Sequence, residues 1–152
     1  MSNFKKQKTT KNYRTVGEII CDLSLMLSPP ENLSVSDAAE KYRYVNQPGA
    51  YVGKWLNVTV PYMIEPMDTF TSRDFTGMIF VGPAQCGKTD GLILNTITYS
   101  VKVDPMDMIV FSPGMIEARD FGLRRVDRLH RHSVEVGKML LPTADADNRF
   151  DK

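Results

Sequence analysis

Eight consecutive residues have the types and spacing needed to bind a phosphate group. Residues 82–89, "GPAQCGKT", match the pattern G-x-x-x-x-G-K-[ST] at every fixed position. Gly82 is expected to permit a sharp exit from a strand, and Gly87 to let the backbone approach an anion with no Cβ in the way. Lys88 is then expected to bridge the β- and γ-phosphates of a nucleotide, and the Thr89 hydroxyl to bind Mg²⁺.

The backbone of this loop is expected to hold the phosphates. The N–H groups of residues 84–89 would point inward as a nest, reinforced by the dipole of the following helix. Cys86 precedes that helix N-terminus, where a thiolate is stabilised, but we interpret it as a loop filler rather than a redox group. The candidate nucleotide-binding residues are Gly82, Pro83, Ala84, Gln85, Cys86, Gly87, Lys88 and Thr89. Lys88 and Thr89 are the candidate catalytic residues, and Thr89 is the candidate Mg²⁺ ligand.

A strand, a helix and a second strand are needed to position such a loop. Residues 78–81 form a short continuous apolar run, typical of a buried parallel strand, and enter the loop directly. Residues 88–101 predict a helix, and residues 108–111 predict a second strand. The expected buried side of that helix consists of Leu92, Ile93, Ile97 and Val101. This order predicts a right-handed βαβ unit, and therefore an α/β fold with a parallel sheet flanked by helices.

The residues before this unit predict a small helical segment. Thr15 and Glu18 form a capping box, and apolar residues follow at helical spacing until Pro29 and Pro30 end the run. Core packing is the default role of this helix, and a partner-binding face is the alternative. A second helix is predicted to begin near Ser34, which has Asp37 three residues later.

Three shorter segments separate the second helix from the predicted strand. The stretch "NQPGAYVG", residues 46–53, has the composition of a loop. Alternation over residues 56–60 suggests a short strand. Pro61 suits the first turn of a helix, which Pro66 is expected to kink or end.

Composition limits the classes of protein to which the chain can belong. A length of 152 residues suits one domain, and a formal net charge of +1 argues against a polyanion binder that relies on bulk charge. Two cysteines are too few for a disulfide framework, and no apolar run approaches the roughly 20 residues that span a bilayer. We therefore expect a soluble, cytosolic protein without a membrane partner.

Five stretches, taken in order, resemble one family, the lambda-type large terminase subunit that packages DNA in tailed bacteriophages. They are "LSVSDAAEKYRYV", "PGAYVGKW", "PYMIEPMD", "GPAQCGKTDG" and "MIVFSPGMIEARDF", within residues 33–128. The resemblance implies an ATPase of the additional-strand (ASCE, RecA-like) P-loop class, with ATP and Mg²⁺ as cofactors. It also implies a nuclease domain in the full-length protein, which would form a homo-oligomeric ring in the host cell cytoplasm. The partners that it implies are double-stranded viral DNA, the small terminase subunit and the procapsid portal.

The resemblance also suggests roles for residues outside the loop. "PYMIEPMD" matches the place where such motors hold adenine and ribose, which makes Tyr62 and Glu65 candidates for nucleotide binding; Tyr62 is equally explained as a core aromatic residue. Ser112, Glu117 and Arg119 match the motif that couples nucleotide state to DNA contact. A loop and a helix start explain these three residues equally well.

One departure from the family pattern limits the expected activity. No apolar strand ending in Asp-Glu, the Walker B motif, and no set of nuclease carboxylates occurs before Lys152. We therefore expect a basic flexible arm (1–14), a helical segment (15–45) and the first part of a P-loop ATPase domain (46–152). Such a chain is expected to bind ATP but hydrolyse it poorly, and to be marginally stable and prone to associate through an exposed sheet edge.

The sequence leaves open the role of other charged residues and two alternative functions. Arg124, Arg128 and Arg131 share a helix face that could follow a phosphate backbone, although a solvated face with ion pairs is the preferred interpretation. His130 and His132 are interpreted as surface histidines. The alternative functions are a helicase-like or kinase P-loop protein and a non-catalytic interaction module.

Overall fold

The computed structural model describes residues 14–27, 29 and 31–139, and the chain divides into two compact units, residues 1–30 and 31–152. Residues 1–13 of the predicted basic arm and the tail "TADADNRFDK" lie outside the described residues. Within the described part, no helix is long and apolar enough to cross a membrane.

The N-terminal unit contains a single described helix, α1 (Val16–Met26). The predicted capping box is present: Thr15 N donates to Glu18 Oε2 (2.8 Å), and Glu18 N donates to Thr15 Oγ1 (3.3 Å). These bonds satisfy two of the amide groups that the start of a helix leaves without intrahelical partners. Val16 and Ile20, on the apolar side, are exposed within this unit.

The second unit begins with a helix and an antiparallel hairpin. Ser34 caps the helix as predicted, because its Oγ accepts a hydrogen bond from Asp37 N at 3.2 Å. The first elements are α2 (Val35–Tyr42), β1 (Tyr44–Gln47), β2 (Tyr51–Lys54), the 3₁₀ turns η1 (Asn57–Thr59) and η2 (Pro61–Met63), and α3 (Ile64–Thr69). Tyr44 pairs with Lys54, and Gln47 pairs with Tyr51.

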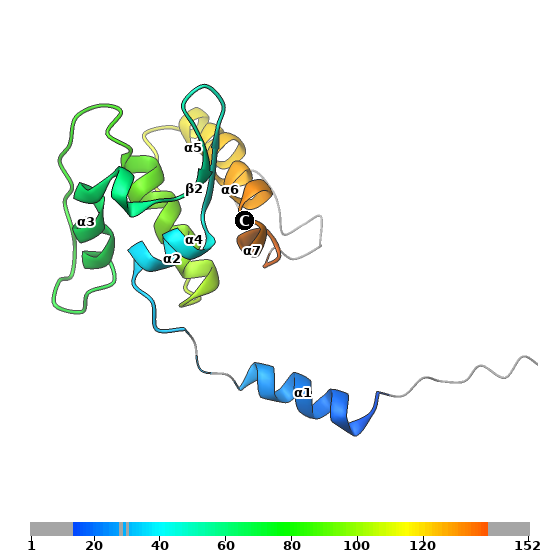
Figure 1. Cartoon of the computed structure of the whole chain (residues 1–152). Coiled ribbons are helices and arrows are strands. Elements are labelled where there is room, and N and C mark those ends of the chain that lie inside the picture. Colours follow the sequence, from blue (N-terminus) through cyan, green and yellow to red (C-terminus); the bar gives the residue numbers. More distant parts are fainter. Residues whose placement is uncertain (1–13, 28, 30, 140–152) are drawn as a thin grey trace, which may run out of the picture. The chain divides into compact units, whose positions relative to one another are not determined.

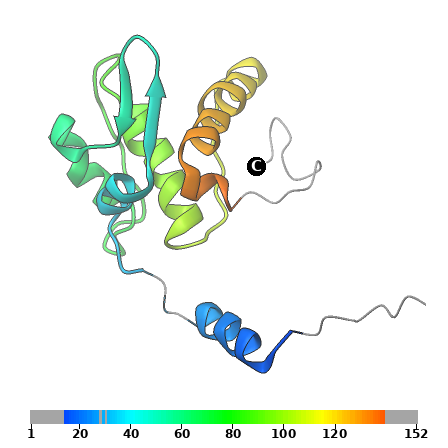
Figure 2. The same cartoon turned by 45° about the vertical axis from the view of Figure 1, so that its right-hand side comes forward.

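The remaining elements are all helical. They are the π-helical turn η3 (Thr89–Leu94), α4 (Asn95–Lys102), α5 (Met115–Phe121), the π-helical turn η4 (Gly122–Val126), α6 (Asp127–His132) and α7 (Val134–Gly137). α4 packs against α2, and α6 packs against β1, so the hairpin lies between the two helical parts of this unit (Figures 1 and 2).

The core of this unit consists of two clusters with α4 between them. The first cluster contains Val35, Ala39, Val45, Trp55, Met63 and Met67, and the second contains Leu94, Val126, Leu129 and Val136. The predicted helix is present, and its predicted apolar side chains are half-buried: Leu92 packs on the first cluster, whereas Ile97 and Val101 pack on the second. Thr98 is fully buried. Its hydroxyl group donates a hydrogen bond to Leu94 O (2.9 Å), one turn earlier in the same helix, so burial does not leave the hydroxyl unsatisfied.

Three local expectations from the sequence were wrong. Residues 46–53 belong to the hairpin, because Gly49 adopts a left-handed φ of 88° that reverses the chain. Residues 57–59 form the η1 turn rather than a strand. Pro66 does not end a helix, because it falls in the first turn of α3, which starts at Ile64 and continues to Thr69.

The two segments predicted as parallel strands have no strand partner among the described residues, where sheet pairing is confined to β1 and β2. Met78 and Phe80 are half-buried, but Ile79 and Val81 are 92% and 90% exposed. Phe111 in the second segment is 91% exposed. A strand requires a neighbour for its backbone groups. The chain is therefore α/β in content, and the parallel sheet stays a prediction.

Candidate functional site

The phosphate loop combines two left-handed residues with a helix start. Gln85 has a φ of 58° and Gly87 a φ of 81°. Alternation between left- and right-handed residues turns successive backbone N–H groups toward one side, which is the geometry of an anion-binding nest. A left-handed conformation is uncommon for a residue other than glycine, and such residues cluster at ligand sites.

Gly82 lies close to two side chains that leave little room for a Cβ. A Cβ at this position would lie 2.9 Å from Cε1 of Phe80 and 3.1 Å from Sγ of Cys86. The side chains of Phe80 and Cys86 therefore pack closely against Gly82, and a larger residue here would require them to shift. Cys86 is half-buried and carries a free thiol.

The ammonium group of Lys88 lies over the start of the loop. Its Nζ donates to Gly82 O at 2.8 Å and to Pro83 O at 2.7 Å. Both acceptors are neutral carbonyl oxygens, and a phosphate oxygen is a stronger acceptor for an ammonium group because the bond is assisted by two charges. Lys88 is thus held at the loop by bonds that an anion can replace.

Thr89 begins the helical run that ends at Lys102, which we call the loop helix. Its first turn contacts both the loop and the first core cluster. Gly91 N donates to Gly87 O at 2.7 Å, which ties the turn to the loop. Gly91 also lies against Met63: a Cβ here would be 3.2 Å from Met63 Cγ. The turn is π-helical, a rare form that is frequent at functional sites.

Of the two candidates from "PYMIEPMD", the structure brings Tyr62 to the loop. Tyr62 Oη donates to Cys86 O at 2.9 Å, although the ring is 54% exposed. The segment itself is fixed to α2, because Asp68 accepts hydrogen bonds from Ser36 N (3.0 Å) and Ser36 Oγ (2.9 Å). Glu65 is exposed, and no described side-chain contact joins it to the loop.

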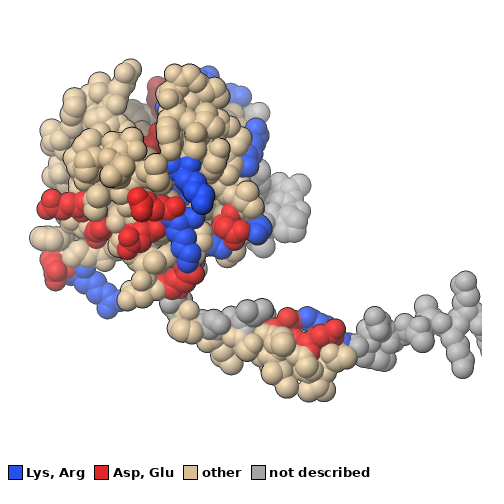
Figure 3. Space-filling view, in the orientation of Figure 1, with Lys and Arg blue, Asp and Glu red and all other residues tan. Residues whose placement is uncertain are grey.

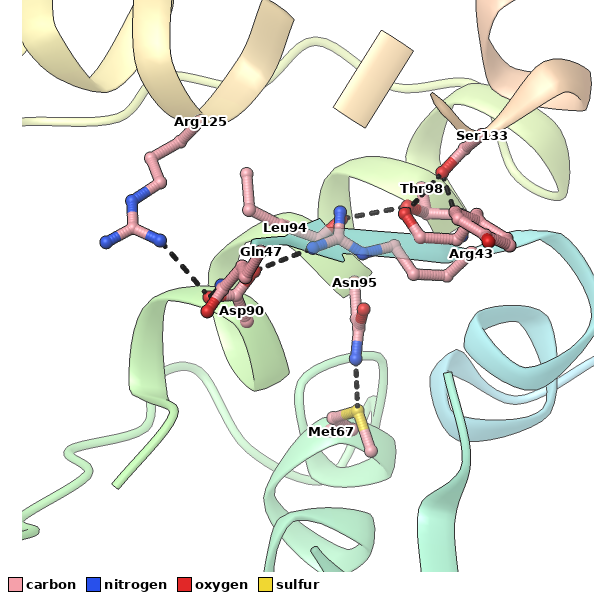
Figure 4. A network of polar contacts seen from close by, with 10 residues as sticks. Arg43, Gln47, Met67, Asp90, Leu94, Asn95, Thr98, Arg125 and Ser133 are labelled. Carbon is pink, nitrogen blue, oxygen red and sulfur yellow. Dashed lines mark hydrogen bonds and ion pairs between the residues drawn. The ribbon is translucent and has the colours of Figure 1, made fainter. Parts of the chain in front are cut away.

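The sequence did not single out the polar group behind the loop, which is centred on Asp90 (Figure 4). Arg43 Nη2 donates to Asp90 Oδ1 at 2.8 Å, and Gln47 Nε2 donates to Asp90 Oδ2 at 2.7 Å. Arg125 Nη1 lies 3.5 Å from the same Oδ2. The one available signal was position, because Asp90 is an acidic residue in the first turn of the helix that follows the loop.

Arg43 is a buried cation, with a side chain that is 3% exposed. Burial lowers the pKa of Arg43 to about 10, and the Asp90 carboxylate partly offsets this effect. Arg43 therefore remains charged at neutral pH. Its Nε and Nη1 atoms are buried without a hydrogen-bond partner among the described residues, so Asp90 is the counter-charge on which the guanidinium depends.

The candidate coupling residues do not reach the loop among the described contacts. Ser112 is half-buried, while Glu117 and Arg119 are exposed on α5. Arg125 makes a polar link between this helical region and the helix after the loop, through Asp90, beside the apolar contacts of the second core cluster.

The helix face of Arg124, Arg128 and Arg131 agrees with the preferred interpretation, a solvated face with ion pairs. Arg124 pairs with Asp120 (3.5 Å), and Arg131 pairs with Asp127 (4.0 Å). Arg128 lines a shallow hollow together with Arg43, Asp90 and Arg125. Acidic and basic side chains are mixed on the face of this unit seen in Figure 3. His132 is half-buried rather than on the surface, because Asn46 Nδ2 lies 2.8 Å from its Nε2.

A comparison with protein families supports the interpretation of the loop. A family model described as phage terminase large subunit gpA, ATPase domain, matches residues 49–152. The matched residues include Tyr62, the whole loop, Asp90 and Arg125, but not Arg43. No curated protein and no solved structure matches the chain.

Proposed function

Because the chain belongs to the phage terminase large-subunit ATPase family, which forms part of an ATP-driven DNA-packaging motor, we propose that residues 82–89 bind Mg²⁺-ATP. One observation carries the proposal. The Lys88 ammonium lies across a loop with left-handed residues at Gln85 and Gly87, and its hydrogen bonds within the described part of the chain go to the loop's own carbonyl oxygens. This arrangement supports an anion as the ligand, since a nest of N–H groups and an ammonium group in the same loop both favour negative charge.

The loop residues fit ATP and Mg²⁺ in distinct roles. Backbone N–H groups of residues 84–89 cradle the phosphates, and Lys88 exchanges its carbonyl partners for β- and γ-phosphate oxygens. Thr89 supplies a hydroxyl to Mg²⁺, which neutralises phosphate charge when bound. Tyr62, held at the loop by Cys86 O, is the candidate contact for adenine or ribose. Glu65, exposed on the same segment, is the weaker candidate.

Slow hydrolysis is part of the same proposal. Phosphoryl transfer needs a group that orients the attacking water, in addition to the loop and the metal. No apolar strand ending in Asp-Glu occurs in the 152 residues. We therefore assign nucleotide binding to these residues, and not the orientation of the attacking water. In the complete motor we place this region within a RecA-like parallel sheet, as part of a ring that acts on double-stranded viral DNA with the small subunit and the procapsid portal, in the host cytoplasm. A nuclease belongs to that complete motor.

The test is the substitution Lys88→Ala. It is expected to abolish binding of a fluorescent ATP analogue in Mg²⁺ while the circular dichroism spectrum and melting temperature remain close to wild type, because the described hydrogen bonds of the ammonium are all to the loop. Lys54→Ala removes the same charge from an exposed position on β2 and serves as the matched control. Equal nucleotide affinity in wild type and Lys88→Ala would refute the proposed site.

A further inference from the structure

The residue immediately after Thr89 is fixed by three side chains from distant parts of the sequence. The Asp90 carboxylate accepts from Arg43 at 2.8 Å and from Gln47 at 2.7 Å, and both residues precede Asp90 by more than 40 positions. Arg125, from η4, approaches at 3.5 Å on the other side. Figure 4 shows Asp90 between these groups, at the point where the loop helix meets the hairpin.

This carboxylate has little freedom to move. Its side chain is 18% exposed, and its principal partner Arg43 is 3% exposed. Moving Asp90 away would leave a buried guanidinium without its only described side-chain hydrogen bond. Because an uncompensated buried charge is strongly unfavourable, the pair acts as a fixed point for the first turn of the helix.

Fixing Asp90 also fixes the direction of Thr89. Consecutive side chains on a helical turn point about 100° apart, or slightly less in a wider π-helical turn. With Asp90 directed toward Arg43 and the hairpin, the Thr89 side chain therefore points away from that ion pair, on the side of the turn nearer the loop in sequence. The contact of Gly91 with Met63 holds the next residue of the same turn.

We propose that Asp90 is a positioning residue: clamped between Arg43 and Arg125, it aims the Thr89 hydroxyl at the Mg²⁺ position and links the loop helix to the η4 turn. The inference rests on the proposed function, because Thr89 must bind Mg²⁺ for its direction to matter. Asp90 itself contacts neither nucleotide nor metal. Its effect should therefore depend on Mg²⁺, whereas a purely structural effect would not.

The experiment measures the affinity of the full chain for a fluorescent ATP analogue, once with Mg²⁺ and once with EDTA. In Mg²⁺, Asp90→Asn is expected to weaken binding by about tenfold, the loss typical of residues that orient a metal ligand. In EDTA the same variant is expected to bind within about twofold of wild type, because the backbone nest and Lys88 are unchanged. Asp120→Asn removes a carboxylate from an exposed pair with Arg124 and should change neither affinity.

Arg125→Gln keeps the inference testable if Asp90→Asn does not fold. Arg125 is 42% exposed and its ion pair is longer, so folding should tolerate the change while Mg²⁺-dependent binding falls by about threefold. Two results would overturn the inference: unchanged affinity in Mg²⁺ in both variants, or an equal loss with and without Mg²⁺. Absence of binding in the wild-type chain would instead refute the proposed function, and is visible before any variant is made.

Discussion

The buried pair of Arg43 and Asp90 predicts an asymmetric response to removal of its two members. Asp90→Ala leaves a guanidinium that is 3% exposed with no described side-chain acceptor, so we expect unfolding to become easier by about 3–5 kcal/mol. Arg43→Met leaves Asp90 with Gln47 at 2.7 Å and Arg125 at 3.5 Å, and the carboxylate is 18% exposed. That variant should lose only about 2 kcal/mol.

The double variant Arg43→Met, Asp90→Ala should be more stable than the sum of the single changes predicts. Once the cation has been replaced by an apolar side chain of similar length, the missing carboxylate no longer leaves a buried charge. We expect a total loss of about 2–3 kcal/mol, which corresponds to a coupling energy of about 2–5 kcal/mol between the two positions.

Urea unfolding followed by Trp55 fluorescence measures these values. The chain has one tryptophan, which is 8% exposed in the first core cluster and donates to Asn57 Oδ1 at 2.9 Å. With a slope of about 1.5 kcal/mol/M, a loss of 3 kcal/mol moves the midpoint by about 2 M. The exposed pair of Arg124 and Asp120 is the control cycle, with expected coupling below about 0.5 kcal/mol. Equal losses in the two single variants, or losses that add, would refute the reasoning.

Two further measurements test the acid side of the stability profile and the geometry of the loop. A hydrogen bond from Lys41, with a second from Tyr42, lowers the pKa of Glu31 in the folded protein below 4.5. The Glu31 carboxylate therefore contributes to stability above pH 4.5, and this contribution is lost as the pH falls through the folded-state pKa. Below pH 4.5 the melting temperature of wild type should fall more steeply than that of Glu31→Gln, and parallel profiles would contradict the assignment. Mg²⁺-ATP should slow alkylation of Cys86, half-buried in the loop, but not of the exposed Cys21, and mass spectrometry that finds equal rates with and without nucleotide would argue against the loop geometry.

Local patterns in the sequence predicted the helix starts correctly, but not the strands. The loop motif, the capping box at Thr15 and the cap at Ser34 depend on residues within three or seven positions of one another, and the structure has both caps. The helix after the loop was also expected from apolar spacing alone. Its buried face includes Thr98 and Asn95, which hydropathy does not select, because α4 is enclosed by a cluster on each side.

The buried ion pair could not be predicted by the same means. Arg43 and Asp90 are 47 positions apart, and arginine and aspartate are residue types usually found on the surface. Only the packing of the hairpin against the loop helix brings the two together. The hairpin itself was missed because "NQPGAYVG" has turn chemistry throughout, and Gly49 marks the reversal only once the flanking residues are known to pair.

The two ends of the phosphate loop are supported very differently, and this difference has consequences for nucleotide binding. The helix start after the loop is held by Asp90 and by Met63 against Gly91, and the loop itself is held by Tyr62 at Cys86 O. Before the loop, residues 78–81 have no strand partner in the part of the chain that the structure describes. A β-strand that pairs with residues 78–81 would remove exposed apolar surface and stiffen the entry to the loop at the same time. Binding by this chain should therefore depend mainly on Lys88 and Thr89, and pairing of residues 78–81 should increase affinity through the N–H groups of residues 84–86.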